Sequence, residues 1–533
     1  MLLLCSVLLV ALAAAFPNGP GVAFPNSTAL PLLTLPYGTW RASQYDARAD
    51  VYTFRNIRYA APPVGNSRWA KPSPPEVVHD IQDGSYGHNC FPVPLPGFDG
   101  PPFANLTQNP GEDCLFLDVY VPGKVFRHHK KPIPVVVWFY GGSYVTGSKD
   151  QALGMGLYDG SGLIQQADQD LIVVTFNYRL GAFGFLAGEA LKGNGSYHAG
   201  FLDQRAALSW VQSYIRLLGG DPDNVSAWGQ SAGSGSILYH LLAEGGTLPP
   251  LFNKAFFQSP GFDPNVNVED VEENFYNFTE AAGCGNATDM MQCLRSVDSS
   301  ALQKGNLVVS TNINPVPDGS YIPQPAQVAL AQESLMVSHV LDEGILFLPN
   351  PLPPGFLESY ITNIFPPDSE DQVKRLVSIY KSQQASTNVS DKQIASELVR
   401  DVIFTCNIRA LIEAYNSKPT WATQYSYIDG ILNGTHTSEL TAEWYNPLTN
   451  PDKQPLFELY QRYIVNHART GDPNSSRRGK LPVFWPKVLG IRREEVGNVL
   501  DLNNDGFHLM DGDPQMLKTS CHAWRDAFVE VAG

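Results

Sequence analysis

The stretch NVSAWGQSAGSGS at residues 224–236 changes character in its middle. Its first residues are largely β-branched or aromatic, as in a strand. Four small residues follow close together: Gly229, Ser231, Ala232 and Gly233. Small residues let a strand and the next helix approach closely, and they tolerate a strained turn between the two. The stretch therefore predicts a strand, a sharp turn and a helix, with the Ser231 side chain projecting from the turn.

The segments around this stretch repeat the alternation of strand and helix. Residues 132–142 (PIPVVVWFYGG) and 171–184 (LIVVTFNYRLGAFG) are apolar runs that stop at glycines, which is typical of strands buried on both faces of a sheet. Residues 201–218 carry apolar side chains at every fourth position, as an amphipathic helix does. This order predicts the α/β class, with a large, mostly parallel central sheet covered by helices on both faces.

The N-terminus and the charge restrict where the protein acts. Residues 1–15 are apolar and end in three alanines, so we expect a cleaved secretory signal peptide followed by a single domain over 16–533. We expect no membrane span in the rest of the chain. The net charge of −16 opposes binding to nucleic acid. The oligomeric state stays open.

Cysteine usage agrees with an extracellular destination. Once Cys5 is removed with the signal peptide, an even number of cysteines remains in a chain sent to an oxidising compartment, which predicts disulfides. No spacing among them suggests a metal site. Proximity along the chain favours three pairs: Cys90 with Cys114, Cys284 with Cys293, and, by remainder, Cys406 with Cys521.

The opening stretch also matches a nucleophile motif. The pattern GxSxG at residues 229–233 follows a predicted strand and opens a predicted helix, the context in which such a serine becomes a nucleophile. A plain glycine turn would give the same letters. Serine also needs a base and an oxyanion site. The backbone amides of Gly142 and Ser143, just after a predicted strand, together with that of Ala232, are the candidates for that site.

Several separate stretches resemble the type-B carboxylesterases, the family of cholinesterases and fungal lipases within the α/β-hydrolase superfamily. The resemblance runs from about residue 56 to 528, and the chain is most similar to secreted fungal esterases. It rests on the opening stretch and on four more: NIRYAAPPVGNSRW (56–69), EDCLFLDVYVP (112–122), NYRLGAFGFL (177–186) and SHVLDEGILF (338–347).

This resemblance implies the remaining catalytic residues. The family acid is the glutamate of a DEG turn, here Glu343, and the family base is a histidine after a glycine-rich turn, here His436. Their order after Ser231 is that of α/β-hydrolases. Asp342 and His508 are the nearest rivals. The implied reaction is acyl transfer to serine and then to water, with no metal or organic cofactor.

The resemblance also assigns scaffold roles. Two ion pairs, Arg68 with Glu112 and Arg179 with Asp203, correspond to structural pairs of the family. The three family disulfides match the pairs that proximity favours.

Three departures from the family pattern bear on the substrate. Gln230 stands where the family usually has a glutamate, and the loop between Cys90 and Cys114 lacks the tryptophan that binds choline in cholinesterases. The same loop is too rich in proline for the helical lid of the lipases. Its phenylalanines could line an aromatic or acyl pocket or could pack beneath the loop: Phe91, Phe98 and Phe103.

We therefore expect a secreted serine carboxylesterase that acts on uncharged, soluble esters with short-chain or aromatic acyl groups. A lipase or sterol esterase acting on long-chain esters is the alternative. A non-catalytic adhesion module of the family is a remote one, because such proteins typically break the Ser231, Glu343 and His436 set.

Glycosylation sequons are frequent along the chain, as suits a secreted product. Asn224 lies in a predicted strand, and Asn433 lies three residues before the proposed base, so we expect both to be unmodified. The candidates for modification are Asn26, Asn105, Asn194, Asn277, Asn286, Asn388 and Asn474.

Overall fold

The computed structural model describes residues 21–23, 29–94, 109–127, 131–151, 157–262, 268–310, 313–322, 333–430, 432–450, 452, 454–489 and 493–532. The predicted signal peptide (1–15), two sequons (Asn26 and Asn105) and two pocket candidates (Phe98 and Phe103) lie outside these residues. Within them, no helix combines the length and the apolar character needed to cross a membrane.

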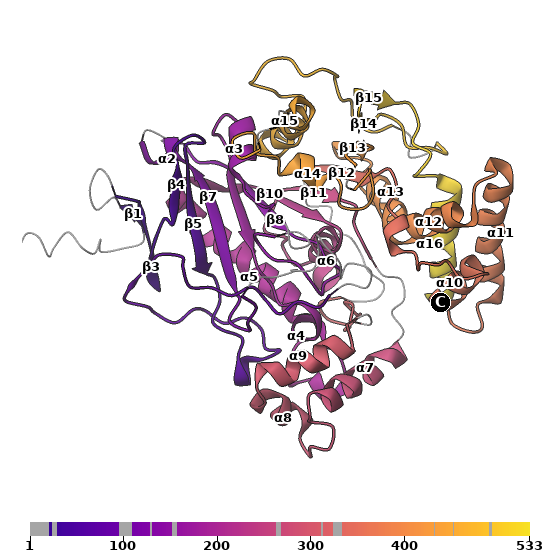
Figure 1. Cartoon of the computed structure of the whole chain (residues 1–533), viewed down its shortest axis with the longest axis horizontal. Coiled ribbons are helices and arrows are strands. Elements are labelled where there is room, and N and C mark those ends of the chain that lie inside the picture. The colour runs from indigo at the N-terminus through magenta and orange to yellow at the C-terminus, as the bar shows by residue number, and fades with distance from the viewer. Residues whose placement is uncertain are drawn as a thin grey trace, which may run out of the picture.

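An 11-stranded sheet forms the centre of the molecule (Figure 1). Its middle strands, from β9 through β8 and β10 to β14, are parallel, and the strands at both edges are antiparallel. In spatial order the strands are β15 (Gly506–Met510), β14 (Val499–Asn503), β13 (Thr420–Tyr425), β12 (Ser334–Val340), β11 (Lys254–Gln258), β10 (Gly220–Gln230), β8 (Ile133–Phe139), β9 (Ile172–Phe176), β7 (Phe116–Pro122), β5 (Val51–Arg58) and β4 (Gln44–Asp46).

The apolar runs predicted from the sequence form the middle of this sheet. All residues of β9, β11, β12 and β13 are buried, as is β8 except for Pro134. Val136 of β8 lies opposite Val173 of β9 and Ser226 of β10. Such strands contribute apolar side chains to both faces, so the sheet needs a helical layer on each side.

Helices cover the two faces of the sheet. The helix α3 (Ser161–Gln166) connects β8 to β9, and α5 (Ala199–Tyr214) connects β9 to β10. Because β8 lies between β9 and β10, the two connections run in opposite directions across the sheet. Right-handed crossovers therefore place α3 and α5 on opposite faces. Figure 1 shows α3 beside α15 (Pro455–Thr470) on one side of the central strands, and α5 beside α6 (Ala232–Gly246) on the other. The predicted α/β-hydrolase architecture is confirmed.

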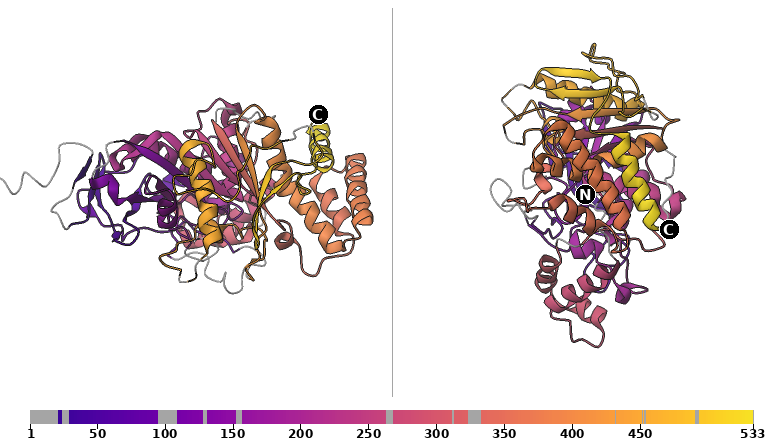
Figure 2. Two further views of the ribbon diagram at one scale, coloured as in Figure 1. Left: turned by 90° about the horizontal axis from the view of Figure 1, so that it is seen from above. Right: turned by 90° about the vertical axis from the view of Figure 1, so that its right-hand side faces the viewer.

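Smaller units surround this core. A four-stranded sheet at the N-terminal edge contains β1 (Gly21–Ala23), β2 (Leu32–Leu35), β3 (Gly38–Arg41) and β6 (Ile81–Gln82). One helical group consists of α7 (Val268–Ala281), α8 (Met290–Ser296) and α9 (Ser299–Val308). A second group extends beyond the sheet at the opposite end and has its own apolar core (Figure 2): α10 (Phe356–Ile364), α11 (Glu370–Thr387), α12 (Asp391–Arg400) and α16 (Lys518–Ala532).

The three disulfides join the cysteine pairs that the sequence predicts. Cys90–Cys114 closes the loop before β7, and Cys284–Cys293 closes the connection between α7 and α8. Cys406–Cys521 joins α13 (Cys406–Ala414) to α16, across a sequence separation of 115 residues. This last disulfide ties the outer helical group to the main body.

The described sequons differ in exposure. Asn194, Asn277, Asn286 and Asn388 are exposed and accessible for modification. The Asn474 amide is half-buried, donates to Trp485 O and accepts from Trp485 N, so we expect it to remain unmodified.

The Asn224 side chain in β10 is also occupied, because it accepts from Lys254 Nζ and donates to Arg469 O. Asn433 is exposed, and its amide oxygen accepts from Gly430 N.

Both ion pairs implied by the family resemblance are formed and buried. Arg68 Nη2 lies 2.7 Å from Glu112 Oε1, and Arg179 Nε lies 2.7 Å from Asp203 Oδ2. The Arg179 side chain is 4% exposed and the Asp203 side chain 0%. The second pair joins the segment after β9 to α5.

Replacing Arg179 with methionine should destabilise the protein by about 3 to 5 kcal/mol, because the Asp203 carboxylate loses its partner in a buried position. Urea unfolding of Arg179→Met beside the wild type measures this change. The matched control is Lys192→Met, which breaks the exposed pair with Glu189 and should change the free energy of unfolding by less than about 1 kcal/mol. Equal effects of the two substitutions would contradict a structural role for the buried pair.

Candidate active site

Ser231 occupies a strained turn between β10 and α6. Its φ is 55° and its ψ is −127°, a backbone conformation that residues other than glycine rarely adopt. A Cβ atom at Gly229 would lie 2.7 Å from the backbone of Gly233, and one at Gly233 would lie 2.0 Å from Phe139 O. Gly229 and Gly233 are therefore required for the helix to pack this closely on the strand.

Two further polar residues reach the same edge of the sheet. Glu343 follows β12, and His436 follows β13. The strands β10, β12 and β13 are parallel, so their carboxyl ends meet at one edge, where open α/β sheets bind ligands. The Nδ1 atom of His436 lies 2.6 Å from Glu343 Oε2, and both side chains are buried.

The Glu343 carboxylate is held on its other oxygen as well. Oε1 accepts from Ser259 Oγ at 2.6 Å and from the backbone N–H of Val340 at 2.9 Å. A carboxylate fixed in this way accepts the Nδ1 hydrogen of His436, which leaves Nε2 as the proton acceptor of the neutral imidazole. The arrangement can therefore take a proton from a neighbouring hydroxyl.

The rival residues lie elsewhere or are engaged differently. Asp342 Oδ1 accepts from Ser396 Oγ at 2.6 Å. His508 is exposed on β15, opposite Asp501. Neither arrangement resembles the contact between Glu343 and His436.

Ser231 and His436 line a common cavity with a volume of about 50 Å³. Gly142, Ser143 and Gln230 also contribute to its wall. Gly142 and Ser143 have φ values of 122° and 52°, so the loop after β8 turns sharply at the cavity. Ala232, the third oxyanion candidate, is buried and directly follows Ser231 as the first residue of α6.

Two aromatic rings flank the imidazole of His436. The ring centroid of Phe404 lies 4.5 Å from that of the imidazole, and the centroid of Phe347 lies 5.2 Å from it. Phe404 belongs to a single π-helical turn, Asp401–Thr405, between α12 and α13. Such apolar neighbours exclude water and strengthen the electrostatic interactions of the buried pair.

Phe91 packs against the main apolar core of the protein. Its ring stacks on Phe183 with centroids 5.3 Å apart. This is the second of the two roles that the sequence allows for Phe91.

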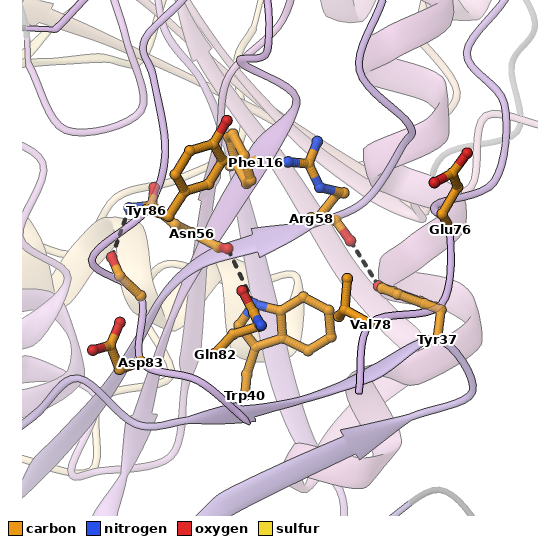
Figure 3. A pocket seen from close by; sticks show the side chains of 11 residues that line it. Tyr37, Trp40, Asn56, Arg58, Glu76, Val78, Gln82, Asp83, Tyr86 and Phe116 are labelled. Atoms are coloured by element: carbon orange, nitrogen blue, oxygen red, sulfur yellow. Dashed lines mark hydrogen bonds between the residues drawn. The ribbon is translucent and has the colours of Figure 1, made fainter. Parts of the chain in front are cut away.

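A larger cavity of about 300 Å³ lies between the N-terminal sheet and β5 (Figure 3). Two of its polar side chains bind the backbone of β5: Trp40 Nε1 donates to Asn56 O, and Tyr37 Oη donates to Arg58 O. The Arg58 guanidinium is bound by Asp113. These bonds join the N-terminal sheet to β5, so we interpret this cavity as a gap at the junction of the two sheets.

A sequence profile described as Carboxylesterase family matches residues 30–524. The chain belongs to this family. It is 41% identical to a "Secreted lipase" of Arthroderma benhamiae, over 95% of this chain and 94% of the relative. It is 31% identical to "Carboxylesterase patB" of Aspergillus clavatus, over 90% and 93% of the two chains.

Solved structures agree with this assignment. The Aspergillus niger EstA crystal structure matches with a TM-score of 0.79 and 27% identity, over 95% of this chain and 100% of EstA. A structure titled PNB esterase matches with a TM-score of 0.74 and 25% identity, over 92% and 99% of the two chains. The protein is therefore a carboxylic ester hydrolase with the α/β-hydrolase fold.

The esterase site contains residues that the sequence did not reveal. Ser259 and Phe404 lie on separate segments and carry no motif of their own, and Phe347 ends the stretch 338–347 quoted above but had no role assigned to it. Ser259 directly follows β11 at the carboxyl edge of the sheet. A polar residue at that position in the sequence indicates a candidate site residue.

Replacing Ser259 with alanine should lower kcat/KM of the esterase for p-nitrophenyl acetate about tenfold to hundredfold. A hydrogen bond to a buried carboxylate contributes about 1.5 to 3 kcal/mol, and Glu343 would lose that bond. The control is Ser338→Ala on β12, because this buried hydroxyl has no hydrogen-bond partner in the described structure. A Ser259→Ala enzyme as active as Ser338→Ala would contradict the supporting role of Ser259.

Proposed function

We propose that Ser231 is the nucleophile of this esterase, His436 its general base and Glu343 the acid that orients the base. The observation that supports the proposal most is the buried 2.6 Å contact between His436 and Glu343, at a cavity that the strained Ser231 shares. A hydroxyl, an imidazole and a carboxylate in this order form the catalytic triad of serine hydrolases.

The reaction follows from these roles. His436 Nε2 takes the Ser231 proton while Oγ attacks the ester carbonyl, and the backbone amides of Gly142, Ser143 and Ala232 stabilise the developing oxyanion. Glu343 stabilises the imidazolium that forms. The alcohol then leaves with the proton from His436, and water repeats the sequence on the acyl-enzyme.

The substrate is an uncharged ester. Gln230, beside Ser231, contributes no negative charge to the cavity wall, and the loop from Cys90 to Cys114 contains no tryptophan to bind a quaternary ammonium group. A cationic ester would therefore gain neither an ion pair nor an indole contact in this part of the site.

The acyl group is short or aromatic. Pockets that hold larger ligands enclose roughly 300 to 1,000 Å³. The cavity beside Ser231 has about 50 Å³, and Tyr158, Phe347 and Leu440 close its sides. This volume favours short acyl groups over aromatic ones. The proline content of the loop from Cys90 to Cys114 disfavours the helical lid of a lipase and so favours dissolved esters.

A lipase acting on long-chain esters is the second candidate. The relative at 41% identity is named a secreted lipase. Phe347 lines the cavity and is 37% exposed, and Leu341 and Ile428, which follow β12 and β13 at the same edge of the sheet, are 41% and 45% exposed. Exposed apolar residues beside a catalytic cavity would suit contact with an oil surface.

We also propose that the protein is secreted as one catalytic domain over residues 16–533. The apolar N-terminal segment ending in alanines, the three disulfides and a relative named as secreted support this destination.

Initial rates on p-nitrophenyl esters from acetate to palmitate, with methyl ferulate as the aromatic ester, test the substrate class. We expect the highest kcat/KM on short or aromatic acyl groups, with no rise in rate as the ester passes its solubility limit. Ser231→Ala provides the background for each substrate. A maximum at long chains with a rise at the interface would establish the lipase instead.

A matched pair of neutral and cationic esters tests the charge of the site. Acetylcholine and its uncharged analogue 3,3-dimethylbutyl acetate have nearly the same shape, so we expect kcat/KM for the choline ester to be no higher than for the analogue. Gln230→Glu, which restores a carboxyl group, should shift this ratio towards acetylcholine. A tenfold preference of the wild type for acetylcholine would contradict the proposed uncharged substrate.

A further inference from the structure

Two threonine hydroxyl groups in the wall of the candidate active site have no hydrogen-bond partner among the described residues. Thr146, in the loop after β8, and Thr437, directly after the base, both line the cavity that Ser231 and His436 share. The Oγ1 atoms of both threonines are shielded from bulk solvent. Because buried hydroxyl groups are almost always paired, these two require an explanation.

The backbone of Thr437 is strained. Its φ is 79°, in the left-handed region that β-branched residues almost never adopt. A glycine would occupy this position at a lower cost in free energy. Strained residues are concentrated at ligand-binding sites, where the surrounding structure holds them. A threonine at a position whose backbone favours glycine therefore points to a use of its hydroxyl group.

Gln230 adds an amide group to the same wall. Its Nε2 atom lies 3.3 Å from Nε2 of His436. An added Cβ at Gly141 would lie 2.8 Å from Gln230 Oε1, and one at Gly142 would lie 2.8 Å from Thr146 Cγ2. Only the backbone of these two glycines separates Gln230 from Thr146. The polar side chains therefore form a continuous part of the wall that ends at the base.

This polar part of the wall is the part nearest to the alcohol of a bound ester. In the proposed mechanism, His436 Nε2 returns its proton to the alcohol oxygen, which must lie within hydrogen-bonding distance of that atom. Gln230 is the side chain beside Nε2, so the carbon atoms that follow the alcohol oxygen meet the polar wall. Leu346 and Phe347 supply an apolar part of the cavity wall, against which a hydrocarbon acyl group can pack.

We propose that Thr146, Gln230 and Thr437 bind a second, free hydroxyl group on the alcohol part of the ester, so that the substrate is a monoester of a small diol or triol. This inference rests on the proposed role of His436 as the base. A hydroxyl group both donates and accepts hydrogen bonds, so one such group can supply the partner that both threonines lack. The cavity volume of about 50 Å³ limits the alcohol to a few carbon atoms.

A matched pair of acetate esters tests the proposal. 2-Hydroxyethyl acetate and propyl acetate differ only in that a methyl group replaces the terminal hydroxyl group. We expect kcat/KM to be at least about tenfold higher for 2-hydroxyethyl acetate, because propyl acetate leaves the buried hydroxyl groups without partners. The ratio is corrected for intrinsic reactivity by dividing it by the ratio of the alkaline hydrolysis rates. A corrected ratio near one would overturn the proposal.

Threonine variants assign the effect to the polar wall. Thr146→Val and Thr437→Val each remove one hydroxyl group and should lower the corrected ratio several-fold, whereas Thr437→Ser keeps the hydroxyl group and should retain the ratio. The matched control is Thr175→Val on β9. Thr175 is also buried and its hydroxyl group also has no partner in the described structure, but it does not line the cavity. An equal fall in Thr175→Val, or an unchanged ratio in both cavity variants, would contradict the assignment.

Transfer of the acyl group to an added alcohol gives a second measurement, in which the acyl part is constant. The acetyl-enzyme from p-nitrophenyl acetate can react with an alcohol in place of water. The ester bond to Ser231 then breaks, the acetyl group forms an ester bond with the alcohol oxygen, and the alcohol proton passes through His436 to Ser231. Equal concentrations of ethylene glycol and 1-propanol should give at least about tenfold more 2-hydroxyethyl acetate than propyl acetate. Similar yields of the two esters would refute selective binding of the diol.

The dependence on Ser231 separates a failure of this inference from a failure of the proposed function. Labelling of Ser231 by a fluorophosphonate in each threonine variant shows whether the nucleophile is intact. Hydrolysis of both acetates that persists in Ser231→Ala would disprove the proposed function, and this inference with it. Hydrolysis that requires Ser231 but shows a corrected ratio near one would disprove this inference alone.

Discussion

The buried contact between His436 Nδ1 and Glu343 Oε2 is the interaction on which the proposed chemistry of this esterase depends. At 2.6 Å it fixes the tautomer of the imidazole and leaves Nε2 as the proton acceptor. The carboxylate keeps its place because Ser259 and the Val340 amide bind its second oxygen. Without these two hydrogen bonds the buried Glu343 carboxylate would keep only His436 as a partner, so the same contacts affect both the stability and the proposed function of this region.

The sheet brings these groups together. Ser231, Glu343 and His436 come from segments far apart in the sequence, and each follows the end of a parallel strand. Parallel strands packed on both faces are rigid, so the loops at their ends hold defined positions. The strain at Ser231 persists because β10 and α6 determine its backbone from both sides.

Much of this arrangement could be predicted from the sequence. The apolar runs that became β8 and β9 and the small residues around Ser231 are local signals with a direct physical meaning. Glu343 and His436 required the family resemblance, because single acidic residues and histidines carry no periodic pattern. The disulfide pairs followed from proximity in two cases and from elimination in the third.

The surroundings of the base could not be predicted in the same way. Phe404 reaches His436 through a single π-helical turn, and Phe347 reaches it from a different loop. Such contacts depend on how loops fold over the sheet edge, and a local sequence pattern does not encode them. Glu439 resembles any solvent-facing glutamate in the sequence, and only its burial distinguishes it.

The most direct test of the account is covalent trapping of the nucleophile. The purified protein is treated with a fluorophosphonate, and the labelled peptide is identified by mass spectrometry in the wild type and in Ser231→Ala. The account predicts a single label on Ser231, with labelling slowed by at least a hundredfold in His436→Ala, because the base would be missing. Equal labelling of the wild type and Ser231→Ala, or a label on another residue, would contradict it.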